Sequence, residues 1–536
     1  MQKGRVKAEK RTDGIAETIC SFLMSVWCFC ALIAVPLYAP DGYVEIGLYK
    51  WQVFIYPSLI ILPLSMLLTL TGWLGKRKKA AGDKRPLPVL IALFAAACVV
   101  TAILASGRSS AESSSDLLMP AKWNVTGGLY GWYMGLLAQL AFAAAAICLT
   151  YVRPKAKLLN IALVPATAFI FLMGLLNRFM IDPLGMFKRL DNYHYTQYLS
   201  TIGQNTWYSS YLVIMMSAGL YFYYTSEKKN IRTGAAVYTI LCSASLITQG
   251  SDCALLAVGA AMAFMFAYSF DNKEKLKRWL ELCLMILLAW RLVGLLQLAA
   301  GERAVDAGGL MTHLTQAPYL WILPVAVLIL RVLVSGKNVE VKKFKKLRTA
   351  CLLMIPAAIL LGITYIVLNT LGCLPQAFSS DNGYLLFDDE WGSARGIIWK
   401  SSVKVITENI REHPLRLLFG EGPDAFTAAA YEAAGDALRA KWPGKLVPNA
   451  HNEWLNMLIN YGLIGGGLYL AIFVLVIKNC LSAVKTKPGL MMPLLCLTAY
   501  MVHNFFCYQQ VICTAPAFIL IGMVCREGYG TGSKSG

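Results

Sequence analysis

Long apolar blocks, separated by polar segments, follow one another along almost the whole chain. A helix needs about 20 predominantly apolar residues to cross the hydrocarbon core of a bilayer. Hydrophobic residues make up 57% of the chain and charged residues 15%, against about 45–50% and about 25% in soluble domains. The blocks have the length that a bilayer requires, and the sequence therefore predicts an all-α polytopic membrane protein.

The apolar blocks predict about 12–14 transmembrane helices. Several of them contain Gly and Pro, which spanning helices tolerate where neighbouring helices satisfy the backbone. The expected spans cover residues 15–38, 51–74, 87–105, 127–151, 158–177, 207–225, 233–250, 253–270, 279–299, 318–335, 349–371, 454–477, 490–506 and 511–525.

One polar stretch, residues 372–453, is far longer than the other connections. It divides the chain into an N-terminal transmembrane bundle (1–371), a large loop (372–453), and C-terminal transmembrane helices with a tail (454–536). Connections longer than about 12–15 residues are usually functional or disordered. Trp391, Trp399 and other aromatic residues give this loop apolar material, so we expect it to order against the membrane domain.

The distribution of charge predicts the orientation of the chain. The net charge is +19, and most Lys and Arg residues lie in alternate connections. The positive-inside rule places these connections, and both termini, in the cytoplasm. The large loop is then extracytoplasmic. Because the basic residues follow the membrane topology and do not form a basic face interleaved with aromatic residues, we expect no nucleic-acid partner.

The densest group of polar residues lies where the large loop returns to the membrane, at His451, Asn452 and Glu453. Polar residues at such a position are costly and usually face a cavity or the bundle interior. An unperturbed histidine has a pKa of about 6.5, so His451 can take or give a proton near neutral pH. Capping of the following helix is the structural alternative for these residues.

Two further segments of the loop carry candidate residues. The segment GSARGIIW contains Arg395, whose guanidinium fork matches phosphate oxygens. The segment LFGEGPDAF has two glycines around Glu421, and such a turn either brings backbone amides near an anion or is simply a tight turn.

These elements resemble the O-antigen ligase and polymerase family, which are bacterial membrane glycosyltransferases of the GT-C type. The resemblance rests on R-x-x-x-W (Arg395, Trp399), then G-x-G (Gly420, Gly422), then HN before an apolar helix with YGLIGG. Weaker matches lie at 200–212 and 246–260, so the resemblance covers about residues 195–480. It implies a GT-C-like bundle in the bacterial cytoplasmic membrane.

The resemblance implies transfer of a glycan from undecaprenyl diphosphate to an acceptor hydroxyl of a glycan, a lipid or the cell wall, with inversion and without a metal or cofactor. It assigns Arg395 to the diphosphate, assisted by Arg178, Lys188 or Arg189. His451 would contact the diphosphate or deprotonate the acceptor. Preplaced cations would stabilise the charge that grows on the leaving diphosphate.

The sequence departs from the family at Asp252, where many relatives have an arginine after the serine. Asp252 is therefore an alternative base, or it orients a cation. Glu421, Asn452 and Glu453 are candidate contacts to the acceptor or the glycan. The sequence does not separate a ligase from a polymerase, and a transporter that flips lipid-linked oligosaccharide is the alternative from another class of protein.

Overall fold

The computed structural model of the chain describes residues 2–76, 86–108, 123–191, 194–336 and 339–529. Within these residues the fold is helical apart from two short antiparallel hairpins. One pairs β1 (Trp123–Asn124) with β2 (Gly128–Leu129), and the other pairs β3 (Tyr198–Leu199) with β4 (Gly203–Gln204). The all-α architecture expected from the apolar blocks is confirmed.

Each expected apolar block coincides with a helix. Nine helical segments in the described residues are long and apolar enough to span a membrane, and three more are shorter. The basic segment at 75–86 lies largely outside the described residues. The helices are α1 (Gln2–Phe29) continued by α2 (Val35–Leu37), α3 (Ile46–Lys76), α4 (Pro86–Ala105), α5 (Leu136–Tyr151), α6 (Ala156–Asn177), α7 (Asn205–Thr225), α8 (Lys229–Thr248), α9 (Cys253–Ser269), α10 (Lys273–Ala300), α12 (Ile322–Ser335), α13 (Lys345–Thr370), α17 (Glu453–Ala483), α18 (Met491–His503) and α19 (Val511–Tyr529).

The block expected at 127–151 begins too early, because α5 starts only at Leu136. The residues before α5 form the β1–β2 hairpin, and the carboxylate of Asp424 accepts hydrogen bonds from the backbone of this segment. Its Oδ2 accepts hydrogen bonds from the backbone N–H groups of Leu129 (2.8 Å) and Met134 (3.1 Å). Gly128 has a φ of +91°, and a Cβ there would lie 2.5 Å from the same Oδ2, so the hairpin requires glycine at this position.

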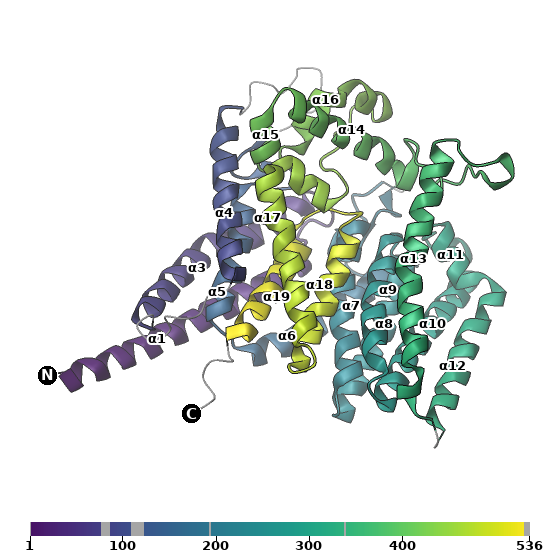
Figure 1. Cartoon of the computed structure of the whole chain (residues 1–536), viewed down its shortest axis with the longest axis horizontal. Coiled ribbons are helices and arrows are strands. Elements are labelled where there is room, and N and C mark those ends of the chain that lie inside the picture. Colours follow the sequence, from purple (N-terminus) through teal and green to yellow (C-terminus); the bar gives the residue numbers. More distant parts are fainter. Residues whose placement is uncertain (1, 77–85, 109–122, 192–193, 337–338, 530–536) are drawn as a thin grey trace.

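The centre of the bundle is formed by α7, whose side chains are buried along most of its length. It packs against α8 and α18, while α18 also packs against α9. On the other side, α5 packs against α19 and α4 against α17. The C-terminal helices α17 to α19 therefore lie among helices from the first half of the chain (Figure 1).

The large loop folds into a small helical domain over one end of the bundle (Figure 1). This loop domain contains α14 (Trp391–Arg411), α15 (Pro414–Phe419) and α16 (Phe426–Lys441). It has its own core, in which Ile398, Phe426 and Leu438 are at most 4% exposed. The start of α1 and the end of α19 lie toward the opposite end of the bundle (Figure 1).

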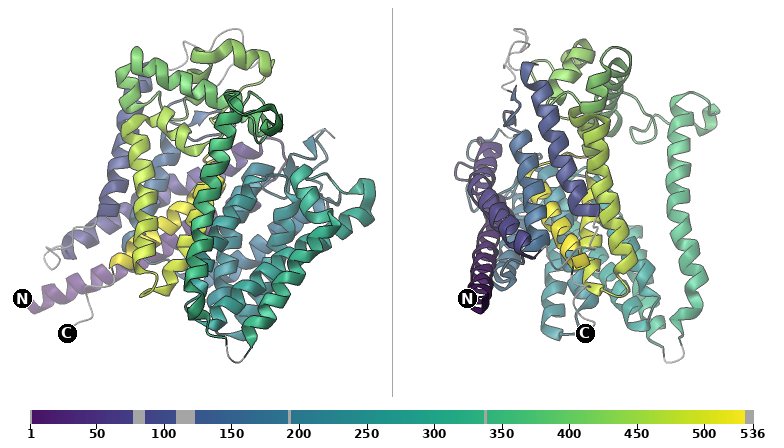
Figure 2. Two further views of the ribbon diagram at one scale, coloured as in Figure 1. Left: turned by 45° about the vertical axis from the view of Figure 1, so that its right-hand side comes forward. Right: turned by 60° about the vertical axis from the view of Figure 1, so that its left-hand side comes forward.

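Helices α12 and α13 lie at the periphery. Figure 2 shows α13 standing apart from the bundle along much of its length, with its upper end leading into the loop domain. In the most apolar stretch of α13 none of the residues is buried inside the protein, and in that of α12 only 6% are. Apolar surface of this extent is suited to contact with lipid chains.

Candidate functional site

Arg395 lies at the start of the regular part of α14, after a turn with unusual backbone geometry. Gly392, Ser393 and Ala394 all have φ near +60°, a conformation that is unfavourable for the two non-glycine residues. The Arg395 guanidinium donates from Nε to the carbonyl oxygen of Phe506 (3.1 Å) and from Nη1 to that of Gly392. Its Nη2 has no hydrogen-bond partner among the described residues, so one edge of the fork is open to a ligand.

His451 is also held in a left-handed conformation, with φ of +47°. Its backbone N–H donates to Asn449 Oδ1 (3.0 Å), and its ring meets that of Tyr508 edge to face at 5.1 Å. Within the described part of the chain, neither ring nitrogen has a hydrogen-bond partner. Burial, and second the nearby charge of Arg395, lowers the pKa of His451 to about 3. The imidazole is therefore neutral at neutral pH.

Asp252 lies in the turn between α8 and α9, directly before Cys253. It is partly exposed, and its Oδ2 accepts a hydrogen bond from the Tyr384 hydroxyl at 2.6 Å. This hydrogen bond, more than burial, raises the pKa of Tyr384 to about 12, while the charge of Arg395 opposes the increase. Arg395 thus acts electrostatically on both His451 and Tyr384. The fold brings Arg395, His451 and the Asp252–Tyr384 pair together from three distant parts of the sequence.

The three basic residues expected to assist Arg395 are either exposed at the surface or buried among other partners. Arg189 is exposed and forms an ion pair with Asp41 (2.7 Å), and Lys188 is exposed beside Gly185. Arg178 is 2% exposed. In the described part of the chain none of the three has a hydrogen bond or an ion pair with Arg395, His451 or Asp252, so we do not propose them as ligands of a diphosphate.

Arg178 supports the turn that carries Asp252. Its guanidinium donates to the carbonyl oxygens of Tyr195 (3.2 Å), Thr196 (2.9 Å) and Gln249 (2.8 Å). Burial lowers the pKa of Arg178 to about 10, which leaves it charged at neutral pH. Since three carbonyls occupy the cation, its role in this structure is to fix the turn at Gln249.

The G-x-G turn around Glu421 docks onto a break in α17. Gly462 interrupts that helix with φ of +66° and ψ of −171°. The backbone N–H of Glu421 donates to the carbonyl of Ile459 (2.9 Å), and that of Gly422 donates to Asn460 (3.1 Å). These amides satisfy carbonyls that the break leaves without helical partners, so they are not free to bind an anion.

The side chain of Glu421 is 3% exposed and points into the loop domain. Its Oε1 accepts a hydrogen bond from Asn409 Nδ2 (2.6 Å), and its Oε2 lies 3.7 Å from Arg416 Nη1. Asn452 is the N-cap of α17, where its Oδ1 accepts from the N–H of Leu455 (3.0 Å). Both residues thus have structural contacts in place of the glycan contacts expected from the sequence.

Glu453 is fully buried and anchors a network between helices. Its carboxylate accepts hydrogen bonds from the hydroxyls of Tyr469 (2.5 Å) and Tyr500 (2.8 Å) and from Asn504 Nδ2. The amide of Asn504 donates to Glu453 through Nδ2, so the Oδ1 of the same side chain lies on the side of His503, 3.0 Å from Nδ1 of that ring. With no exposed surface, Glu453 does not face a glycan.

The network continues through His503 to the turn that holds Asp252. His503 Nε2 lies 2.8 Å from Ser209 Oγ, and the ring lies close to Cys253. His503 thus forms a hydrogen bond between α18 and α7. No pattern in the sequence pointed to Tyr384 or Cys253. Only the fold places Tyr384 beside Asp252 and Cys253 beside His503.

We expect Glu453→Ala to destabilise the protein strongly. It removes the acceptor of one amide and of two tyrosine hydroxyls, of which Tyr500 keeps Thr514 as a partner, and each buried group left unsatisfied costs about 1–3 kcal/mol. Thermal unfolding of purified Glu453→Ala should show a midpoint temperature several degrees below that of the wild type. The midpoint of Glu453→Gln should lie between those of Glu453→Ala and the wild type. The exposed Glu412 of the loop domain is the matched control, and an equal effect of Glu412→Ala would contradict the assignment.

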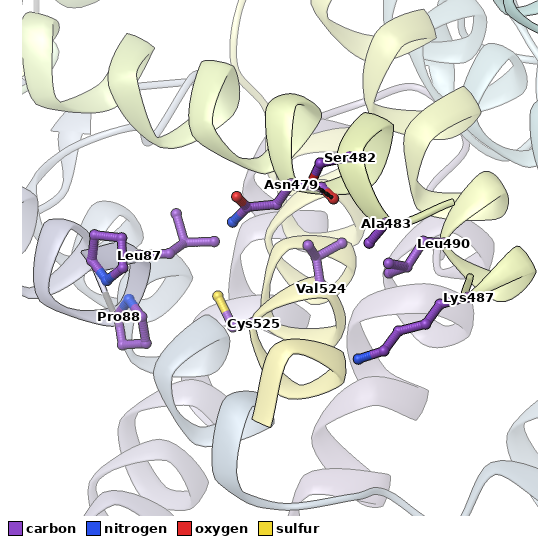
Figure 3. A pocket seen from close by; sticks show the side chains of 10 residues that line it. Leu87, Pro88, Asn479, Ser482, Ala483, Lys487, Leu490, Val524 and Cys525 are labelled. Carbon is purple, nitrogen blue, oxygen red and sulfur yellow. Dashed lines mark hydrogen bonds between the residues drawn. The ribbon is translucent and has the colours of Figure 1, made fainter. Parts of the chain in front are cut away.

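A separate cavity of about 280 Å³ lies between the ends of α4, α17 and α19 that point away from the loop domain (Figure 3). Leu87, Val524 and Cys525 give it apolar walls, and Lys487 lies at its edge, with Nζ donating to the carbonyl of Glu527. It contains none of the site residues above. Within the described residues, no group of three or more His, Cys, Asp or Glu side chains is placed to hold a metal ion.

The fold and the site define a multi-pass membrane protein with a polar site where a folded loop domain meets the helical bundle. Residues 304–470 match the model of the family described as O-antigen ligase. This part of the chain is therefore similar to the O-antigen ligase family, in agreement with the resemblance that the sequence motifs indicate. The match includes Arg395 and His451 and ends before Tyr500; Asp252 precedes it. A comparison with curated proteins gave no match.

Proposed function

We propose that the protein transfers a glycan from undecaprenyl diphosphate to an acceptor hydroxyl at the outer face of a bacterial cytoplasmic membrane, with both termini in the cytoplasm. The observation that carries this proposal is the juxtaposition of Arg395, with an open Nη2, and His451, with unpartnered ring nitrogens. A cation suited to phosphate beside a neutral base is the pair of groups that such a substitution requires.

In the proposed reaction the acceptor oxygen attacks the anomeric carbon as the bond from that carbon to the diphosphate oxygen breaks. The electron pair leaves with the diphosphate, whose growing negative charge Arg395 stabilises. The hydroxyl proton passes to His451. Because a bound diphosphate offsets the positive charge of Arg395, substrate binding raises the pKa of His451 toward the range useful for a base. Attack opposite the leaving group inverts the anomeric configuration.

The Asp252–Tyr384 pair offers a second acid–base group at the same site. The Tyr384 hydroxyl donates to the carboxylate, which leaves the other oxygen of Asp252 to accept a hydrogen bond from a sugar hydroxyl. In this proposal Asp252 orients the acceptor, and no second cation replaces the arginine found in many relatives at this position.

The exposed α13 supports a membrane-bound donor. Its apolar surface is unburied along the span, and its end leads into the loop that carries Tyr384. A polyprenyl chain that lies in the bilayer beside α13 needs no closed pocket, because lipid surrounds it. Its diphosphate would then reach Arg395 from the side.

The test is deletion of the gene in its host, with profiling of undecaprenyl-diphosphate-linked glycans. Complementation with wild type should restore the normal profile, whereas His451→Ala should reduce transfer by about 10²–10⁴-fold, as expected for loss of a general base, while the protein still reaches the membrane. Partly exposed His413, the residue that precedes α15, provides a control substitution in the loop domain. Full rescue by His451→Ala would overturn the assigned base.

The lipid-linked products also separate the possible reactions. Accumulation of long lipid-linked chains indicates a ligase, and accumulation of single repeat units indicates a polymerase. Accumulation confined to the cytoplasmic leaflet would overturn the transferase and favour a transporter of lipid-linked oligosaccharide.

A further inference from the structure

A group of five aromatic rings lies next to Arg395 and has no role in the proposed chemistry. The members of this aromatic patch are Phe387, Trp391, Trp399, Phe505 and Phe506. Ring centroids are 5.3 Å apart for Phe387 and Trp391, 5.1 Å for Trp391 and Trp399, and 6.2 Å for Trp399 and Phe506, the last pair nearly parallel at 20°. The patch joins the start of α14 to the segment after α18, and Arg395 Nε bonds the carbonyl of Phe506.

The patch is fixed in orientation and remains accessible. Trp391 Nε1 donates to the carbonyl of Tyr384 (3.2 Å), and Trp399 Nε1 donates to that of Ala450 (3.1 Å). Phe505 is 46% exposed, and the other four rings are partly exposed. In an aromatic belt at a membrane surface, the indole N–H groups face water and head groups. Here both N–H groups bond the protein backbone, which holds the ring planes in place.

Charged and polar groups border the patch. Lys400 Nζ lies 2.8 Å from Asp389 Oδ1 and 5.8 Å from the centre of the Phe387 ring. The side chain of Glu390 pairs with Lys441. Asp389 and Glu390 are 57% and 65% exposed. Aromatic faces within a border of exposed carboxylates and ammonium groups match a ligand with C–H faces and hydroxyl edges, because the ring faces are negative and attract C–H groups.

We propose that the aromatic patch binds a sugar ring of the glycan, with Trp391 as the main stacking surface and the Asp389–Lys400 pair as hydroxyl partners. The proposal rests on the proposed function and adds a glycan subsite to it. A polyprenyl chain suits the patch less well, because its charged border would have to be desolvated. The sugar can belong to the acceptor or to the donor, and the experiment separates these two sources.

The experiment measures binding to the full chain in lipid nanodiscs with two probes. One probe is the oligosaccharide released by mild acid from the surface polysaccharide of the host. The other is the same glycan linked to undecaprenyl diphosphate, extracted from the deletion strain. The variants are Trp391→Ala, Trp391→Phe and Arg395→Ala, with Trp442→Ala as a control tryptophan of the same loop domain outside the patch.

We expect Trp391→Ala to weaken binding of the free oligosaccharide at least tenfold and Trp391→Phe less than threefold. Arg395→Ala should leave free-oligosaccharide binding within twofold and weaken only the lipid-linked probe. If Trp391→Ala affects only the lipid-linked probe, the patch holds the donor sugar. Unchanged binding of both probes to Trp391→Ala, or an equal loss in Trp442→Ala, would overturn the proposal. If Arg395→Ala retains lipid-linked binding while Trp391→Ala loses it, the diphosphate assignment fails and the sugar subsite stands.

Discussion

Arg395→Ala should reduce glycan transfer by about 10²–10³-fold, the loss typical of removing one preorganised group that stabilises transition-state charge. The guanidinium is the cation whose field reaches both His451 and Tyr384, and its Nη2 faces no described partner. Arg395→Lys keeps the charge but loses the planar fork and the bond to the Phe506 carbonyl, so we expect it to recover only a small part of the activity. Transfer from purified lipid-linked donor is the measurement.

Arg411 provides the matched control for this substitution. It lies at the other end of the same helix, α14, and is exposed. Arg411→Ala should leave transfer within about twofold of wild type, since exposed charges far from the reacting groups are screened by solvent. If Arg395→Ala retained more than a tenth of the activity, the proposed role of this cation would be wrong.

Gly462→Ala should prevent stable docking of the loop domain. The combination of φ +66° and ψ −171° is available essentially to glycine alone. An alanine Cβ would lie 2.4 Å from the carbonyl carbon and oxygen of Leu418 and 2.5 Å from the amide nitrogen of Gly420. These are backbone atoms of the docked turn and cannot move aside as a flexible side chain can. We expect a cost of at least about 3 kcal/mol, from strain and the steric conflict together.

The same helix offers a control in Gly467, where an added Cβ would have nothing within 4 Å. Gly467→Ala should be neutral or slightly stabilising, because alanine is favoured over glycine in a helix by about 1 kcal/mol. Thermal unfolding and limited proteolysis of the loop domain would compare the two variants. Equal midpoints and equal protease resistance for Gly462→Ala and wild type would contradict the role of the helix break in docking.

The length and hydrophobicity of the apolar blocks determined the helical membrane bundle from the sequence alone. The apolar blocks match the helices because a spanning helix must satisfy its backbone internally and present apolar side chains to lipid. The block expected to begin at 127 was the exception. Residues 127–135 carry no charge and run directly into the apolar block that follows, but Asp424, almost 300 positions later, holds them as a hairpin.

Single residues with distinctive chemistry also emerged from the sequence. The HN pair and the R-x-x-x-W pattern led to His451 and Arg395, and the fold brings them together. The neutral state of His451 was not predictable, because the pKa of this residue depends first on burial by residues distant in sequence. The role of each remains a proposal for the experiments above.

Only the tertiary structure decided which of the other polar residues face the site. Glu421, Glu453 and Arg178 appear in the sequence as charged groups beside a membrane, where charge suggests function. In the fold each meets partners from other helices or loops, and those partners use its hydrogen-bonding capacity. Residues without sequence signal, such as Tyr384, reach the site for the same reason: long-range packing places side chains, whereas sequence pattern places only the helices that carry them.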